Sequence, residues 1–243
     1  MRANIQEIFR SIQGEGLYVG VPTVFVRFSG CNLRCSYCDT KKSWRMARCF
    51  RYQPVEFNRR IVSVPNDIST EDCADMIFWL TPGGLVSFTG GEPLLHARYI
   101  ARVMKLLGNN YNYLLETNGT LPRALRYLPN LPNIVYSIDL KNNPTCATRH
   151  LSFVRGGKFI QFYKSVPKRS AKYIKIILEK STNIEDILRT LRRVEVSANT
   201  PIFLQPCDNK LDLKQLQKLM YILEKSGYIF KVVPQMHKFV HLK

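Results

Sequence analysis

Runs of apolar residues, rich in β-branched and aromatic side chains, recur along the chain at irregular intervals. Runs of this kind predict buried strands. We interpret seven of them as strands, covering residues 23–28, 85–89, 113–116, 134–140, 173–178, 202–204 and 229–233.

Between several of these strands the apolar positions follow a helical period, and polar capping residues mark where helices begin. The predicted helices cover residues 70–80 after Ser69, 97–107, 184–194 after Asn183, and 212–225. Strands that alternate with helices favour right-handed βαβ units and a mostly parallel sheet, either open or curled into a partial barrel.

Ligands of such folds bind at the carboxyl ends of the strands, so the loops that follow the strands are where chemistry is expected. Residues 31–40 follow the first predicted strand, 90–93 follow the second and 117–119 follow the third. All three loops should lie on one rim. The stretches 41–68 and 142–172 are basic and show no clear period, so we interpret them as insertions in a single domain of residues 1–243.

Length and composition add few constraints. A chain of 243 residues with 45% hydrophobic residues is sufficient for one α/β domain. The net charge of +18 is spread along the sequence, which favours a solvated basic surface over a nucleic-acid-binding face. The first twenty residues contain charges, and no apolar run approaches the length of a membrane span. We therefore expect a cytoplasmic protein and neither membrane nor nucleic acid as a partner.

Three of the seven cysteines lie within eight residues, at Cys31, Cys35 and Cys38. In a reducing compartment such a group is expected to hold metal rather than form disulfides. Three thiolates on a four-iron cluster leave one iron open to a small molecule. The alternative is zinc, with Cys49 or a histidine as the fourth ligand, although structural zinc sites favour paired C-x2-C elements and no second pair exists.

The spacing C-x3-C-x2-C, with the aromatic Tyr37 before the last cysteine, resembles the signature of the radical S-adenosylmethionine (SAM) superfamily. Gly90-Gly91-Glu92-Pro93 resembles its glycine-rich element. The resemblance implies a partial (β/α) barrel with about six parallel strands and a reduced helix set. It also implies a 4Fe-4S cluster on the three cysteines, with S-adenosyl-L-methionine contacted by Tyr37, Gly90, Gly91 and Glu92.

Five shorter blocks narrow the resemblance to the 7-carboxy-7-deazaguanine synthase family. They are residues 9–16, 27–31, 116–119, 137–141 and 234–238. The family is a group of lyases that convert 6-carboxy-5,6,7,8-tetrahydropterin to 7-carboxy-7-deazaguanine with loss of ammonia, in the biosynthesis of 7-deazapurines such as queuosine or archaeosine. The resemblance further implies Mg2+, a homodimer and an electron donor of the flavodoxin or ferredoxin type.

Roles follow by matching positions to the family. The implied substrate-binding residues are Gln13, Glu15, Arg27, Thr89, His237 and Lys243. Ser137, Lys141 and Gln205 are implied cofactor contacts, and Thr40 is the implied contact of Mg2+. Glu116 is the candidate catalytic residue, although the resemblance assigns the chemistry to a 5′-deoxyadenosyl radical.

One departure affects these assignments. The family more often has a compact Ser-Pro-Lys element where this chain has Ser137-Ile-Asp-Leu-Lys141. Two alternative functions also remain open from the sequence. One is a glycyl-radical activase, which shares the cysteine spacing but has no use for a pterin-binding edge at residues 13–15. The other is a zinc-stabilised nucleic-acid-binding module, suggested by the basic charge.

Overall fold

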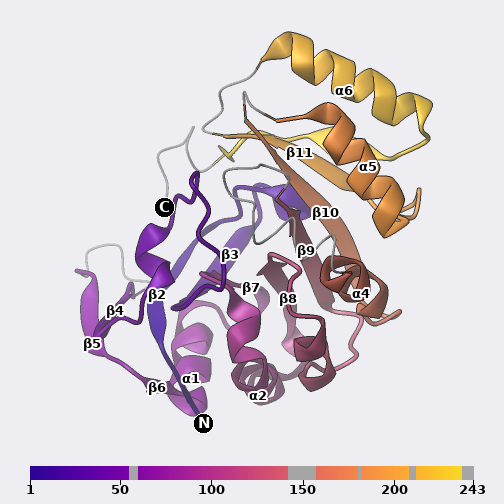
Figure 1. Ribbon diagram of the computed structural model, residues 1–243. Coiled ribbons are helices and arrows are strands. Elements are labelled where there is room, and N and C mark those ends of the chain that lie inside the picture. Colours follow the sequence, from indigo (N-terminus) through magenta and orange to yellow (C-terminus); the bar gives the residue numbers. More distant parts are fainter. Residues whose placement is uncertain (55–59, 142–156, 180–181, 208–211, 237–243) are drawn as a thin grey trace.

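A curved sheet of ten strands forms the centre of the molecule in the computed structural model, which describes residues 1–54, 60–141, 157–179, 182–207 and 212–236 (Figure 1). The strand order is β12-β11-β10-β9-β8-β7-β3-β2-β4-β5. Seven neighbouring strands run parallel: β3 (Pro22–Phe28), β7 (Gly84–Gly90), β8 (Tyr111–Thr117), β9 (Ile134–Leu140), β10 (Ala171–Leu178), β11 (Ile202–Pro206) and β12 (Phe230–Val232).

These seven strands coincide with the seven apolar runs, the last one being shorter than predicted because β12 covers 230–232 of the run 229–233. The predicted α/β fold with a mostly parallel sheet is therefore confirmed. The count exceeds the expected six by one. Within the described residues β12 and β5 are the two edges of the sheet and do not pair with each other. The barrel is therefore partial.

The first strands of the chain were not predicted. β2 (Ile5–Ile12) pairs antiparallel with β3, β4 (Cys49–Tyr52) lies parallel to β2, and β5 (Val62–Pro65) pairs antiparallel with β4. The 41–68 stretch thus widens the sheet. β1 (Arg2–Ala3) and β6 (Ile68–Ser69) form a separate two-stranded sheet.

Helices cover the outer face of the curved sheet (Figure 1). The four predicted helices are confirmed as α1 (Thr70–Leu80), α2 (Ala97–Leu107), α5 (Ile184–Val194) and α6 (Leu213–Lys225). Ser69, Asn183 and Asp212 cap α1, α5 and α6 by accepting backbone N–H bonds. None of the helices in the described part of the chain combines the length and the apolar character needed to cross a membrane.

Another helix, α4 (Lys158–Ser165), lies in the 142–172 stretch between β9 and β10. This part of the stretch therefore continues the strand–helix alternation, which its basic sequence had concealed. Short 3-10 turns complete the described elements: η1 (Gly16–Tyr18), η2 (Lys41–Trp44), η3 (Pro93–His96), η4 (Gly108–Asn110) and η5 (Pro122–Tyr127).

The two faces of the sheet have different chemistry because successive side chains of a strand point to opposite sides. Outward-facing residues join the helices in one large apolar core. On the concave face a smaller apolar group fills the amino-terminal end of the sheet, and it consists of Leu85, Leu114, Val135, Tyr173 and Phe203. Two positions further along the same strands the inward side chains are polar: Ser87, Glu116, Ser137, Lys175 and Gln205. An apolar floor thus supports a polar layer.

The packing of α5 against the sheet gives a test of the outer core. Ile187 of α5 is completely buried, so Ile187→Ala should lower the free energy of unfolding by about 2–5 kcal/mol through lost contacts and the cavity left behind. The matched control is Arg189→Ala on the exposed side of the same helix, expected to change it by less than about 0.5 kcal/mol. Urea unfolding measures both. Equal effects of the two substitutions would contradict this packing.

Candidate active site

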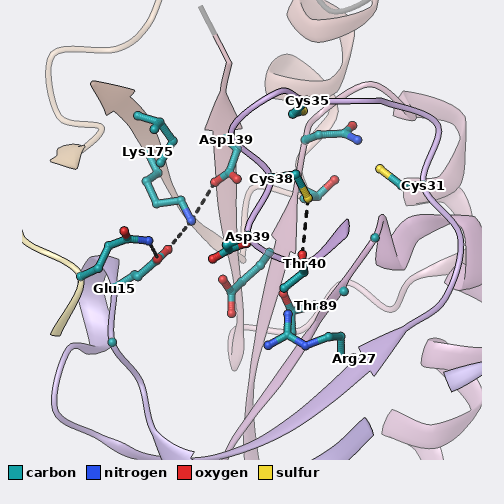
Figure 2. Close-up of a pocket in the computed structure, with 18 of the residues that line it drawn as sticks. Glu15, Arg27, Cys31, Cys35, Cys38, Asp39, Thr40, Thr89, Asp139 and Lys175 are labelled. Atoms are coloured by element: carbon teal, nitrogen blue, oxygen red, sulfur yellow. Dashed lines mark hydrogen bonds and ion pairs between the residues drawn. The ribbon is translucent and has the colours of Figure 1, made fainter. Parts of the chain in front are cut away.

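A large cavity opens at the concave face of the sheet, above the apolar floor (Figure 2). Its volume is about 210 Å3, and its mouth is open to solvent. Fourteen residues expected from the sequence line it: Gln13, Glu15, Arg27, Cys31, Cys35, Tyr37, Cys38, Thr40, Thr89, Gly90, Gly91, Glu116, Lys141 and Gln205.

The three clustered cysteines lie on one side of the cavity, in the loop after β3 (Figure 2). They pack together with Leu33 and Tyr37 in a small apolar cluster, and none forms a disulfide. Burial raises the pKa of Cys31 to about 11, so iron must displace a thiol proton to bind there. Three thiols on one cavity wall fit three-point ligation of a cluster.

No three His, Cys, Asp or Glu side chains of the described residues converge as ligands of a single metal ion.

Two glycines bring the end of β7 against the cysteine loop. A Cβ atom on Gly90 would collide with the backbone of Phe28, and one on Gly91 with the carbonyl of Gly30. The approach forms hydrogen bonds from Gly91 N to Phe28 O (3.1 Å) and from Glu92 N to Gly30 O (2.8 Å). Sequence reasoning assigned these glycines to close contact with a ligand; the structure adds close contact with the backbone that leads into the cysteine loop.

Glu92 is fully buried and is not among the residues that line the cavity. Its carboxylate accepts hydrogen bonds from Leu94 N (3.1 Å), Thr117 Oγ1 (2.7 Å) and Asn118 N (2.8 Å). The carboxylate thus joins the loop after β7 to the loop after β8. Glu92 thus holds the two loops together, and its expected cofactor contact stays a prediction.

These contacts extend to the cysteine loop through amide side chains. Asn118 Nδ2 donates to Asn32 Oδ1 (3.0 Å), and Asn32 Nδ2 donates to Thr120 Oγ1 (2.8 Å). Asn32 lies between the first two cysteines, so the loops after β3, β7 and β8 form one bonded rim. The prediction that these three loops meet is confirmed.

Arg27 and Thr40 lie on the wall near the cysteines (Figure 2). Arg27 Nε donates to Glu7 Oε1 (2.8 Å), and the other oxygen of Glu7 pairs with Arg51 (2.5 Å). Two guanidinium groups share one carboxylate, so positive charge remains at this wall. Thr40 Oγ1 is 3.7 Å from Cys38 Sγ, which puts its hydroxyl beside the thiols.

Gln13 and Glu15 reach the cavity from the β2–β3 loop. Because β2 and β3 are antiparallel, this loop begins at the amino-terminal end of β3, opposite the rim. Its Tyr18 packs on the apolar floor. The substrate-side residues therefore enter from the floor side, whereas the strand pattern of the sequence pointed to the rim loops.

Glu116 of β8 is held by two neighbours on this side of the cavity. Ser87 Oγ donates to Glu116 Oε1 (2.5 Å) and Gln13 Nε2 donates to the same oxygen (3.3 Å). Burial raises the pKa of Glu116, and the negative Glu15 and Asp139 add to the rise, while the Lys175 ammonium opposes it. Glu116 therefore keeps its proton to a higher pH than an ordinary carboxyl.

Lys175 and Asp139 were missed by sequence reasoning and lie at the centre of the cavity (Figure 2). Lys175 Nζ is 2.6 Å from Glu15 Oε2 and 3.1 Å from Asp139 Oδ1. Asp139 Oδ2 is 3.0 Å from Lys141 Nζ. The sequence did contain a signal for these two residues, because each is a charged residue inside an otherwise apolar run. Lys175 lies in Tyr173–Leu178 and Asp139 lies in Ile134–Leu140.

The remaining predicted residues divide into three groups. Gln205 is buried on the cavity wall, and its Oε1 has no hydrogen-bond partner within the described structure, which fits a ligand contact. Ser137 is buried in β9 and is not among the lining residues. His237 and Lys243 lie outside the described residues.

Gln235, which sequence reasoning did not assign to the site, donates from Nε2 to Glu15 Oε1 (2.9 Å).

Comparisons with known proteins agree with this geometry. A model of the radical SAM superfamily matches residues 25–194. Proteins named 7-carboxy-7-deazaguanine synthase are 30% identical in Methanocaldococcus jannaschii, over 97% of this chain and 98% of the relative, and 34% identical in Methanopyrus kandleri, over 98% and 93%. The relative of that name in Archaeoglobus fulgidus is 32% identical over the full length of both chains. These near-complete matches favour the synthase over the activase and zinc alternatives.

Solved structures support the fold. QueE from Escherichia coli superposes with a TM-score of 0.62 at 23% identity, covering 96% of this chain and 94% of that one. A protein described as native anSMEcpe with bound AdoMet has a TM-score of 0.54 at 16% identity, covering 84% of this chain and 61% of that one.

The buried Glu92 gives a prediction about pH. Burial raises its pKa from 4.5 to about 7, so the carboxyl stabilises the fold fully below 4.5, and this contribution is lost as the pH rises to about 7. The slope should be about 1.4 kcal/mol for each pH unit. Glutamine does not titrate, so in Glu92→Gln the fall of the unfolding free energy with rising pH should be absent. This expectation concerns the slope and does not depend on the overall stability of the variant. Urea unfolding at several pH values between about 5 and 8 measures the slope, and equal slopes in both proteins would contradict the prediction.

Proposed function

This chain belongs to the 7-carboxy-7-deazaguanine synthase family of the radical SAM superfamily, and we propose that it converts 6-carboxy-5,6,7,8-tetrahydropterin to 7-carboxy-7-deazaguanine with loss of ammonia. The observation that carries this proposal is the shared cavity. The three cysteine thiols line it together with the family-matched residues Gln13, Glu15, Arg27 and Glu116.

Family membership implies a 4Fe-4S cluster and S-adenosyl-L-methionine, which supply the radical chemistry when bound. The residues present fit these groups. Cys31, Cys35 and Cys38 would hold the cluster. The buried acceptor of Gln205 and the ammonium of Lys141 would contact the cofactor, together with Tyr37, Gly90 and Gly91.

Four polar residues of the cavity suit a carboxylated pterin. The amino edge of a pterin donates hydrogen bonds, and Glu15 is a charged acceptor beside the neutral amide of Gln13. Glu116, whose pKa is raised by burial, would contact the pterin beside Gln13. Arg27 would pair with the substrate carboxylate through parallel hydrogen bonds.

The remaining family-matched residues complete the proposed contacts to substrate and Mg2+. Thr89 would bind substrate, and Thr40 would contact Mg2+, a hard ion that prefers oxygen ligands. Asp39 lies on the same wall and would add a carboxylate. His237 and Lys243 would approach the pterin from the segment that follows Gln235. A homodimer and an electron donor of the flavodoxin or ferredoxin type complete the proposal.

The decisive assay is anaerobic incubation of the reconstituted protein with dithionite, S-adenosyl-L-methionine, Mg2+ and the carboxylated tetrahydropterin. Mass spectrometry should detect the ring-contracted product with a mass loss equal to ammonia. Protein without reductant is the control. Absence of product from a protein with an intact cluster would contradict the proposed reaction.

Substitutions of Arg27 and Cys35 test substrate binding and cluster binding separately. Arg27→Ala should keep the cluster absorbance near 400 nm but weaken pterin binding at least about tenfold, because a charge-paired contact to the carboxylate is lost. Cys35→Ala should lose both the cluster and turnover. Equal pterin affinity in wild type and Arg27→Ala, measured by titration calorimetry on unreduced protein, would refute the role of Arg27.

A further inference from the structure

A buried ammonium, Lys175, occupies the cavity, and none of the family-derived roles involves it. Its side chain is only 6% exposed. Charged groups are rarely buried to this extent without partners, because removing an ion from water costs several kcal/mol. The partners of Lys175 therefore indicate its purpose.

The sheet fixes where this ammonium lies. Lys175 of β10 is in register with Asp139 of β9, so the two side chains leave neighbouring strands at the same height and on the same face. The ion pair between them is 3.1 Å long. Lys175 is thus anchored to the rigid sheet and reaches out from it toward the β2–β3 loop.

The residue of the β2–β3 loop that Lys175 contacts is Glu15. Lys175 Nζ is 2.6 Å from Glu15 Oε2, while Gln235 donates to Glu15 Oε1. Both oxygens of the carboxylate are therefore oriented by donors from elements far apart in sequence. Of these two donors, only Lys175 carries a charge and lies on a regular strand.

The surrounding charges keep Lys175 protonated. Burial alone would lower its pKa, but Asp139, Glu15 and Glu116 together hold that pKa well above the ordinary value of 10.5. Glu15 and Asp139 would otherwise be two negative charges facing one cavity. The ammonium between them removes this repulsion.

We propose that Lys175 is a positioning residue, which holds Glu15 in the orientation and the charged form needed to accept hydrogen bonds from the amino edge of the substrate. The proposal rests on the proposed function, since it assigns a role toward the same pterin. Lys175 itself does not touch the substrate in this role; it acts through Glu15.

The same ion pairs link the two halves of the cavity. Asp139 also binds Lys141, whose ammonium lies 5.7 Å from the centre of the Tyr37 ring in the cysteine loop. Asp139 belongs to the Ser137–Lys141 element in which this chain departs from the commoner Ser-Pro-Lys pattern. This chain thus has a carboxylate of its own to anchor Lys175.

The test compares pterin binding in wild type, Lys175→Met and Lys175→Arg. The protein carries its cluster and S-adenosyl-L-methionine but is not reduced, so that no turnover occurs. Calorimetric titration with 6-carboxy-5,6,7,8-tetrahydropterin should give at least about tenfold weaker binding for Lys175→Met, because one partner of a buried charge pair is removed. Lys175→Arg should restore most of the affinity.

Lys172→Met is the matched control. Lys172 lies on the same strand, is half-buried and donates to Tyr163 O outside the cavity. Its removal should leave pterin affinity unchanged.

The pH dependence of binding separates positioning from a general structural effect. Without the ammonium, Glu15 takes up a proton more readily. Pterin binding by Lys175→Met should therefore fail at a higher pH than in wild type as the pH is lowered. A merely structural role would lower affinity equally across the pH range.

A double-mutant cycle completes the test. In a Glu15→Gln background, Lys175→Met should weaken binding by less than about twofold, because the group that Lys175 positions is already gone. The proposal is overturned if Lys175→Met weakens binding equally in the wild-type and the Glu15→Gln background. It is also overturned if the single mutant Lys175→Met has the affinity and the pH profile of wild type. Lys175→Gln repeats the cycle if the Met variant loses its cluster.

The outcomes also distinguish this proposal from the proposed function. Wild-type protein that binds no pterin would refute the function, and the role of Lys175 with it. Wild-type binding and turnover with no effect of Lys175→Met would refute the role of Lys175 alone.

Discussion

Each charge buried inside the curved sheet needs an opposite charge in direct contact with it. This requirement determines how the charged side chains of the concave face are arranged. Glu15, Asp139, Lys175 and Lys141 satisfy it by alternating in sign along one chain of contacts. The apolar floor beneath them lowers the local dielectric, which strengthens each pair and makes an unpaired charge costly. The polar layer is therefore fixed in place before any ligand arrives.

Much of the fold follows from local patterns in the sequence. Apolar runs and helical periods identify the parallel strands and four of the outer helices, because these elements bury one continuous side and have ordinary caps. The short spacing between Cys31 and Cys38 also places the three cysteines in one loop, and all three line the cavity. Such features depend on neighbours within a few residues, which a sequence displays directly.

The rest depends on contacts between distant segments. Nothing near Glu92 in the sequence reveals that its carboxylate bonds the loop after β8 instead of lining the cavity. Lys175 and Asp139 become partners through strand register, which the sheet as a whole decides. β2, β4 and α4 were missed because their mixed polar and apolar residues are stabilised by tertiary packing more than by intrinsic preference.

The bond from Gln235 to Glu15 spans 220 positions of the sequence, and Met236 N also donates to Gly14 O. Contacts of such high sequence separation form late, because the chain between them must first be ordered. On the ribosome, the segment around Glu15 emerges early and lacks this partner until almost all described strands have been made. Order of synthesis thus delays completion of the site. A partly made chain already contains the cysteine loop, while Glu15 still lacks its partner Gln235.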